Sequence, residues 1–251
     1  MDLTRRTGLG LLAASIAAGA TSAWAQAAPR IATGTYPSGG EDITVVLFSP
    51  PAEGLPMAGA GILLLHGGGG AALEIRRWLE DATRLAARGY TVAFPAWFGD
   101  DPEGRRQGRG AFQRQAALDG FNWLAAQPGV DPDRIGILGF SRGGFMACEL
   151  AVSDAPAKAV VAIAAGGRRE VEEILRKPPT LLIMADGDPV VEPGVTRNWE
   201  RTLRRAGAHV EVEVLDSDHH VPEPAEWRGI FDRAHYFLRD QLRGDAARGG
   251  A

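Results

Sequence analysis

The stretch "RIGILGFSRGG", residues 134–144, runs from an apolar strand pattern directly into a serine that has a glycine two residues away on each side. A helical pattern begins at Arg142. At a sharp strand-to-helix turn the central residue is strained and its neighbours two positions away come so close that glycine is required. The stretch predicts that Gly139 and Gly143 flank a turn that presents the Ser141 hydroxyl. The alternative is a chance pattern in a chain with 33 glycines.

Short strand-like segments alternate with helical segments along the chain. We predict strands at 43–48, 61–66, 90–94, 135–140, 159–164, 180–185 and 209–215. Helical patterns lie between them, at roughly 73–88, 112–127, 142–153, 194–206 and 223–242. This alternation predicts an α/β fold with a mostly parallel sheet of about seven to eight strands and helices on both faces. Functional residues then belong in the loops after the carboxyl ends of strands.

Length, charge and cysteine content limit the possible functions. The chain has 251 residues, 45% of them hydrophobic, which suits one domain with a sizeable core. A net charge of −4 gives no general attraction to nucleic acid or to an anionic membrane. Cys148 is the only cysteine, so the chain can form no internal disulfide and no zinc-finger ligand set.

The N-terminal segment resembles a bacterial export signal. Arg5 and Arg6 precede an uncharged stretch rich in Leu, Ala and Gly, and an A-x-A pattern follows at 23–25. The paired arginines are typical of a twin-arginine signal, and the ordinary secretion route remains open. A membrane anchor is the alternative, but so many small residues insert weakly. We predict that residues 1–25 are removed and that 26–251 form a single domain, periplasmic or secreted, without stable membrane insertion.

A serine nucleophile needs a base, and the base needs an orienting acid. In this architecture they follow in the order serine, acid, histidine, each after a later strand. "DGDPVV" supplies Asp188, and Asp186 is the alternative because it abuts the strand end. "DSDHHVP" supplies two histidines, of which we choose His219 over His220.

The same histidine-containing loop raises the question of a metal site. It holds four potential ligands, Asp216, Asp218, His219 and His220. Adjacent residues of an extended loop point apart, and the usual spacing of one helical turn between zinc-binding histidines is missing. We therefore predict no metal.

The four glycines after His66, in "LLLHGGGGAALE", form a second signal. In acyl transfer, backbone N–H groups stabilise the oxyanion of the attacked carbonyl. We predict that these donors come from Gly67, Gly68 and Arg142. Gly67, Gly69 and Ala72 also fit the dinucleotide pattern G-x-G-x-x-A. That motif needs an acidic residue near the end of the next strand, which "YTVAFPAWFG" lacks, so no cofactor is predicted.

The order of "HGGGG", "GFSRGG", "DGDPVV" and "DHH" resembles the α/β-hydrolase fold and, within it, the dienelactone hydrolase family. "RLAARGYTVAFPAWFG" and "VDPDRIGILGFSRGG" resemble that family closely, and the likeness covers essentially the whole mature chain. It implies hydrolysis of a carboxylic ester or related acyl bond, with Ser141 as nucleophile. Dienelactone hydrolases proper carry cysteine at this position. The loop "DSDHHV" resembles hydrolase loops in which the histidine follows an acidic residue, which selects His219.

Two alternatives to an esterase remain at this point. The stretch "VDPDRIGILGFSRGG" also resembles the acyl-CoA thioesterases and acyltransferases. These enzymes share the acyl-enzyme and differ in which nucleophile then attacks it. A binding protein on the same scaffold is the other alternative, although it would be expected to lack one member of the catalytic set.

The substrate site is less determined. Trp97 and Phe98 follow the third predicted strand and either wall the pocket or only pack. The polar loop at 99–110 contains arginines, Arg105, Arg106 and Arg109, that either attract acidic substrates or are simply solvated. Only a short segment, 165–179, separates the fifth and sixth strands, so we expect no large lid and a small, soluble ester as substrate.

Overall fold

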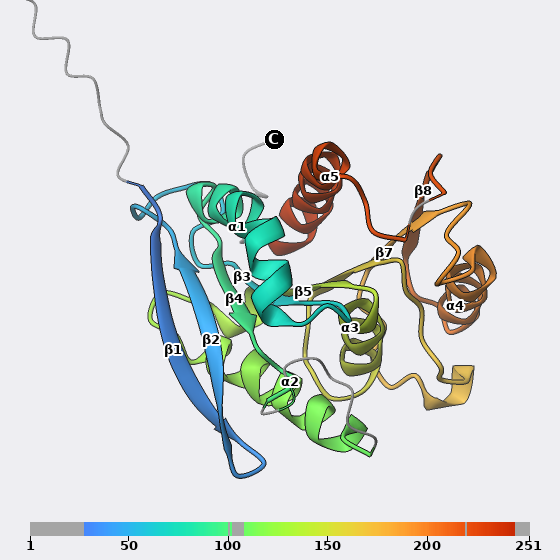
Figure 1. Cartoon of the computed structure of the whole chain (residues 1–251), viewed down its shortest axis with the longest axis horizontal. Helices are drawn as coiled ribbons and strands as arrows, with labels where there is room; N and C mark the ends of the chain where they lie inside the picture. The colour runs from blue at the N-terminus through green and yellow to red at the C-terminus, as the bar shows by residue number, and fades with distance from the viewer. Residues whose placement is uncertain (1–27, 100, 102–107, 219, 244–251) are drawn as a thin grey trace, which may run out of the picture.

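The computed structural model describes residues 28–99, 101, 108–218 and 220–243. Residues 1–25, the predicted export signal, lie outside them. Eight strands form one sheet (Figure 1), namely β1 (Arg30–Ser38), β2 (Glu41–Ser49), β3 (Gly61–Leu65), β4 (Thr91–Pro95), β5 (Ile135–Phe140), β6 (Ala159–Ile163), β7 (Thr180–Ala185) and β8 (Val210–Leu215). Their order across the sheet is β1-β2-β4-β3-β5-β6-β7-β8. Each neighbouring pair from β4 to β8 in that order is parallel. Strand β2 is antiparallel to both of its neighbours, β1 and β4. The predicted α/β fold with a mostly parallel sheet is confirmed.

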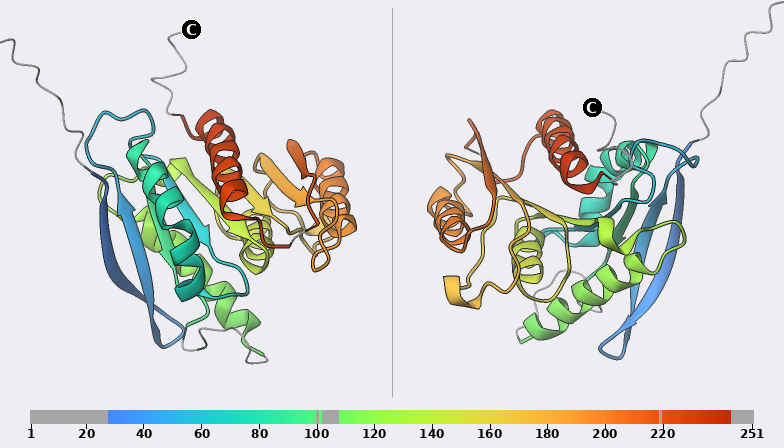
Figure 2. Two further views of the ribbon diagram at one scale, coloured as in Figure 1. Left: turned by 45° about the horizontal axis from the view of Figure 1, so that its top comes forward. Right: turned by 180° about the vertical axis from the view of Figure 1, so that it is seen from behind.

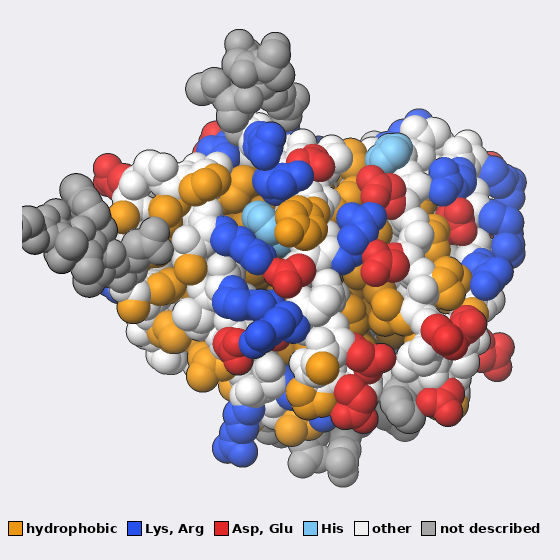
Figure 3. Space-filling model, turned by 90° about the horizontal axis from the view of Figure 1, so that it is seen from above, with side chains coloured by type: hydrophobic (Ala, Val, Ile, Leu, Met, Phe, Trp, Pro, Cys, Tyr) orange, Lys and Arg blue, Asp and Glu red, His pale blue; other side chains and the backbone are white. Residues whose placement is uncertain are grey.

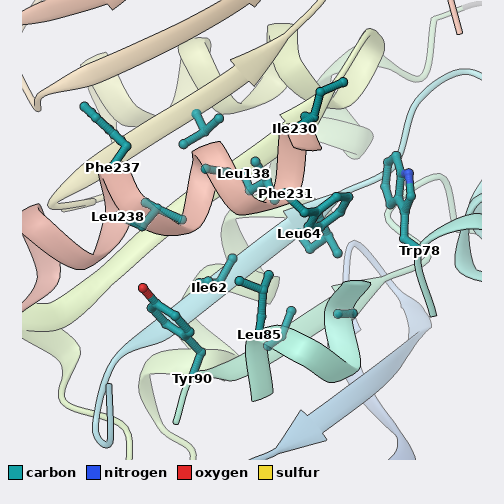
Figure 4. Close-up of a cluster of buried hydrophobic side chains, with 14 of the residues drawn as sticks. Ile62, Leu64, Trp78, Leu85, Tyr90, Leu138, Ile230, Phe231, Phe237 and Leu238 are labelled. Atoms are coloured by element: carbon teal, nitrogen blue, oxygen red, sulfur yellow. The ribbon is translucent and has the colours of Figure 1, made fainter. Parts of the chain in front are cut away.

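In the described part of the chain, five α-helices cover both faces of the sheet (Figure 2), namely α1 (Ala71–Ala87), α2 (Gly110–Ala125), α3 (Arg142–Ser153), α4 (Pro193–Arg205) and α5 (Pro224–Leu242). The apolar faces of α1 and α5 pack on one side, where Trp78 and Phe231 join residues of the central strands in one core cluster (Figure 4). On the other side, α2 and α3 bury residues such as Phe121 and Leu150. Trp199 of α4 packs with Cys148 of α3.

The parallel strands at the centre are buried along their whole length, which is why their sequences are apolar on consecutive residues. At the edge, β8 is only partly buried, in keeping with its alternating pattern.

Strand β1 was not predicted from the sequence, in which the first predicted strand is 43–48. It pairs with β2 over its full length, from Arg30 opposite Ser49 to Ser38 opposite Glu41. Most of its residues are exposed, and it contains Gly34 and Pro37, so it carries no clear apolar periodicity. As an edge strand it gains its stability from pairing with β2 more than from burial.

Three further features concern the surface, the helices and the loops. Basic and acidic side chains are interspersed over the face seen in Figure 3, in keeping with the small net charge. Within the described part of the chain, no helix is both long and apolar enough to cross a membrane. Between β6 and β7 the only element is the short helix η2 (Val171–Glu173), so the described residues contain no lid domain there.

Candidate active site

Ser141 lies at the turn between β5 and α3 in a strained backbone conformation, with φ of 49° and ψ of −118°. The turn has no room for side chains at the flanking glycines. A Cβ on Gly139 would lie 2.2 Å from the Gly143 carbonyl oxygen, and one on Gly143 would lie 2.2 Å from the Leu65 carbonyl oxygen. The Ser141 N–H donates to the Ile163 carbonyl at 2.8 Å, which ties the turn to the neighbouring strand.

Among the described residues, His220 contacts this serine. Nε2 of His220 lies 3.1 Å from Oγ of Ser141, and Nδ1 of the same ring lies 2.9 Å from Oδ2 and 3.1 Å from Oδ1 of Asp188. The imidazole also packs against Phe140, with 5.2 Å between the ring centroids. The three side chains form one hydrogen-bonded series at the carboxyl ends of β5, β7 and β8.

Asp188 is held by its own loop. It is buried, and its Oδ1 accepts hydrogen bonds from the N–H groups of Val190 at 2.8 Å and Val191 at 2.9 Å. Asp186, the alternative acid, is exposed. Its N–H donates to the carbonyl of Leu215, so it helps to join the loops after β7 and β8.

The histidine position differs from the sequence-based choice. We predicted His219 as the base, and His219 itself lies outside the described residues. The structure brings His220 to Ser141 and Asp188 instead. One imidazole fills the position between Ser141 and Asp188, and it is that of His220. The path of the loop after β8 brings the side chain of His220 to this position.

The glycine loop after β3 lies beside the serine turn. A Cβ on Gly68 would lie 3.4 Å from Cδ of Arg142, so Gly68 faces the start of α3. Arg142 is the first residue of that helix, where an N–H has no acceptor within the helix. The predicted donors Gly68 and Arg142 therefore lie close together. The third predicted donor, Gly67, also lies close to Glu74, and its backbone N–H stabilises the charged form of that carboxyl group.

His66 occupies an aromatic cage beneath this loop. Its ring centroid lies 5.8 Å from that of Phe94, 5.3 Å from Trp97 and 4.5 Å from Phe98. Burial lowers the pKa of His66 to about 4, so the ring is neutral at neutral pH, and Nδ1 lies 2.9 Å from the carbonyl oxygen of Gly67. The cage thus fixes the first residue of the glycine loop.

The two aromatic residues predicted as pocket walls have different roles. Both are almost fully buried. Phe98 packs between His66 and the guanidinium of Arg142, which lies 4.5 Å from its ring centroid, so packing accounts for its position. Trp97 packs in the same cage and also lines a pocket.

That pocket has a volume of about 340 Å³ and lies between α2, α3 and the loop after β6. Its lining includes residues that the sequence analysis did not single out, namely Gln113, Phe145, Met146 and Arg168. Nη2 of Arg142 donates to Oε1 of Gln113 at 3.1 Å. Arg142 therefore contributes its backbone to the serine turn and its side chain to the pocket wall. These lining residues come together only in the fold, and the sequence carries no separate signal for them.

Two other sequence-based expectations concern charged groups. Arg105 and Arg106 lie outside the described residues. Arg109 pairs with Glu41 at 2.6 Å and stacks on Phe112, so it ties the start of α2 to β2. Among the described residues, no group of three or more His, Cys, Asp or Glu side chains is placed to hold a metal ion.

Glu74 is the polar residue near the site that the sequence analysis missed. Burial raises its pKa to about 7. A signal for its burial was present, because Glu74 shares the helical spacing of Trp78, Ala82 and Leu85, which form the buried face of α1. An acidic residue on that face must have a polar partner.

Comparison with known proteins agrees with this architecture. Residues 43–221 match the model of the dienelactone hydrolase family. Lipase 1 of Moraxella sp. (strain TA144) is 31% identical over 128 residues, which cover 49% of this chain and 36% of the lipase. Ethyl acetate hydrolase of Pseudomonas putida is 33% identical over 123 residues, 45% of this chain and 35% of that protein. The matched segments thus span about a third of these two relatives.

Solved structures share the fold over most of the chain. A dienelactone hydrolase from Anabaena variabilis has a TM-score of 0.68 at 21% identity and covers 86% of this chain and 99% of its own. A dienelactone hydrolase-like promiscuous phosphotriesterase from metagenomic libraries has a TM-score of 0.69 at 23% identity. The match covers 86% of this chain and 100% of the phosphotriesterase. An acylaminoacyl peptidase from Pyrococcus horikoshii has a TM-score of 0.69 at 16% identity, but this chain covers only 42% of it.

Proposed function

Because the chain belongs to the dienelactone hydrolase family, we propose that it is a serine hydrolase that cleaves a carboxylic ester, or a related acyl bond, of a small molecule through an acyl-enzyme. One observation carries the proposal, namely the hydrogen-bonded series from Asp188 through His220 to Ser141. A serine hydroxyl is a weak nucleophile that needs such a base and such an acid. The names of the two curated relatives, a lipase and an ethyl acetate hydrolase, support the same reaction class.

Acylation begins when Oγ of Ser141 attacks the carbonyl carbon of the ester. Its proton passes to Nε2 of His220, 3.1 Å away, as the new C–O bond forms. Asp188 accepts from Nδ1–H, which sets the tautomer and stabilises the imidazolium. The carbonyl oxygen becomes an oxyanion, which backbone N–H groups of the glycine loop, Gly67 and Gly68, and of Arg142 bind in this proposal. The amino end of α3 adds a favourable field for this charge.

Collapse of the tetrahedral intermediate breaks the bond to the alcohol, which leaves with the proton from His220. The acyl group is then an ester of Ser141. Water attacks this ester while His220 accepts its proton, and a second tetrahedral intermediate forms in the same oxyanion site. Its collapse releases the acid and returns the proton from His220 to Ser141.

The substrate is a small, soluble ester. The pocket beside Arg142, with its volume of about 340 Å³, suits a small acyl or alcohol group. Trp97, Phe145 and Met146 give it apolar walls, and Gln113 and Arg168 add polar groups at its edges. The absence of a lid domain between β6 and β7 in the described residues favours soluble substrates over long lipids.

Labelling with a fluorophosphonate, followed by turnover of p-nitrophenyl esters of increasing chain length, tests the proposal. We expect one labelled site on the wild-type protein, none on Ser141→Ala, and the highest kcat/KM with short acyl chains. Ser141→Ala should remain folded, because the turn depends on its glycines. Residual activity within tenfold of wild type in this variant would remove Ser141 as nucleophile.

We also propose that residues 1–25 direct export to the periplasm or the medium, because paired arginines, an uncharged stretch and an A-x-A pattern follow one another there. Sequencing the exported protein should give an N-terminus at Gln26 or shortly after it. Recovery of an intact N-terminus in the membrane fraction would mean an anchor instead.

A further inference from the structure

Glu74 is a buried carboxyl group that the proposed reaction does not use. It lies in the first turns of α1, and only 1% of the residue is exposed. The backbone N–H groups of Gly67 and Gly69 stabilise the charged form of its carboxyl group. A Cβ on either glycine would lie about 3 Å from Oε1, at 3.0 Å and 3.1 Å. The carboxyl group therefore fits closely against the inner side of the glycine loop.

The other surroundings of this carboxyl group do not explain its burial. The guanidinium of Arg77, one turn along α1, lies 3.8 Å from Oε1 and is itself partly exposed. Oε2 has no hydrogen-bond partner among the described residues. Burial raises the pKa of Glu74 to about 7, and Arg77 and the two N–H groups oppose this rise. The glycine loop thus supplies the polar contacts of a group that is costly to bury.

The glycine loop in turn contacts the serine turn at two places. A Cβ on Gly67 would lie 2.8 Å from Cδ1 of Phe140, the residue before Ser141. Gly68, between the two glycines that Glu74 holds, faces Arg142 on the other side. The loop also closes on itself, because the Gly70 N–H donates to the Gly67 carbonyl at 3.2 Å.

We propose that Glu74 is a positioning residue for the oxyanion site: its carboxylate holds the N–H groups of Gly67 and Gly69 and thereby fixes Gly68 opposite Arg142. The proposal rests on the proposed serine hydrolase function. Glu74 touches neither the substrate nor the reacting atoms. It acts on the barrier because an oxyanion donor helps only when its N–H is oriented before the reaction.

The test compares Glu74→Gln with a matched control on the same helix. Gln keeps the size and one acceptor oxygen but loses the charge that holds two N–H groups. Asp81→Asn is the control, because Asp81 is also buried on α1 and pairs with Arg84 at 2.7 Å, with no contact to the loop among those resolved for it. We expect Glu74→Gln to lower kcat roughly tenfold to a hundredfold with KM within about twofold, and Asp81→Asn to leave both nearly unchanged.

Inhibitor binding separates positioning from general damage. A trifluoromethyl ketone adds to the serine and places an oxyanion in the site, whereas the matching methyl ketone binds without appreciable addition. Glu74→Gln should weaken the trifluoromethyl ketone by the same factor as kcat and leave the methyl ketone unchanged. Equal losses for both ketones, or none for either, would overturn the proposal.

A second variant keeps the test decisive. Glu74→Asp retains the charge but withdraws the carboxylate by one methylene, so it should show the same selective loss. If neither variant folds, Glu74 is structural and the proposal fails. Failure of the serine hydrolase function itself is recognised separately, because wild type would then bind neither the fluorophosphonate nor the trifluoromethyl ketone.

Discussion

His220 meets Ser141 across 79 positions of sequence, with 3.1 Å between its Nε2 and the serine Oγ. The serine follows β5 and the histidine follows β8, at opposite ends of one half of the sheet. Asp188, after β7, holds the far side of the same ring. The imidazole is thus held by one partner residue on each nitrogen and packs against the ring of Phe140. A proton can move between serine and histidine without a change in side-chain position.

His220→Ala should abolish most of the turnover. The variant removes the base, and loss of one member of such a set typically lowers kcat by roughly 10⁴-fold or more. His219→Ala is the matched control, and it should keep activity within about tenfold of wild type, since one imidazole fills the position beside Ser141. Steady-state kinetics with a short p-nitrophenyl ester measures both. The reverse pattern would transfer the role to His219.

Asp188→Asn should lower kcat by roughly 10³- to 10⁴-fold, because an amide next to Nδ1 favours the wrong tautomer of His220. The fold should remain, since the amide oxygen can still accept from the N–H groups of Val190 and Val191. Asp186→Asn changes an exposed acid in the same loop and should have little effect. Comparable losses in the two variants would mean that the loop as a whole matters, and Asp188 would lose its specific role.

The sequence predicted most of the architecture because the central strands have strong, simple patterns. The strands predicted at 135–140 and 180–185 coincide with β5 and β7, and α3 begins at Arg142 as predicted. Burial on both faces leaves only apolar residues there, so the pattern is unambiguous. Strand β1 escaped because an exposed edge strand is specified by its partner and not by its own periodicity.

The sequence predicted the residue types and the chain order of the candidate site, but not which of two adjacent histidines faces Ser141. Ser141 could be chosen because the close approach of Gly139 and Gly143 leaves a local signature. The order of acid and histidine follows from the order of the strands. The choice between His219 and His220 depends on the direction in which the loop leaves β8, and two adjacent residues of the same type give no local signal for it. Pocket residues such as Gln113 meet the site only through packing.

Gly143→Ala should prevent folding or strongly destabilise the protein. Its Cβ would lie 2.2 Å from the carbonyl oxygen of Leu65 and 2.5 Å from that of His66, and neither backbone group can move without disturbing β3. Gly229→Ala is the control, because a Cβ there meets nothing within 4 Å in the middle of α5. It should stabilise the protein by about 0.5–1 kcal/mol through helix propensity. Urea unfolding compares the two, and a Gly143→Ala protein as stable as wild type would contradict the tight turn.

The last prediction concerns acid stability. Burial lowers the pKa of His66 to about 4 from its ordinary value of 6.5, so the folded state resists protonation that the unfolded state accepts. Between these two values the unfolded chain binds more protons, and stability falls as the pH falls through that window. Over this pH window the protonation of His66 lowers the free energy of unfolding by about 3 kcal/mol.

His66→Asn tests this contribution, because Asn keeps a donor for the Gly67 carbonyl and does not titrate. Its free energy of unfolding should be lower than that of wild type at pH 7, because the cage of Phe94, Trp97 and Phe98 is left partly empty. The deficit should shrink by about 3 kcal/mol as the pH falls to 4, since only wild type loses the His66 contribution. Glu74 has the opposite effect, because its raised pKa of about 7 makes stability fall as the pH rises. It is present in both proteins, so its contribution cancels in the difference. Urea unfolding between pH 4 and 7 gives the two curves, and parallel curves would mean that His66 is already protonated in the folded state or does not titrate differently on unfolding.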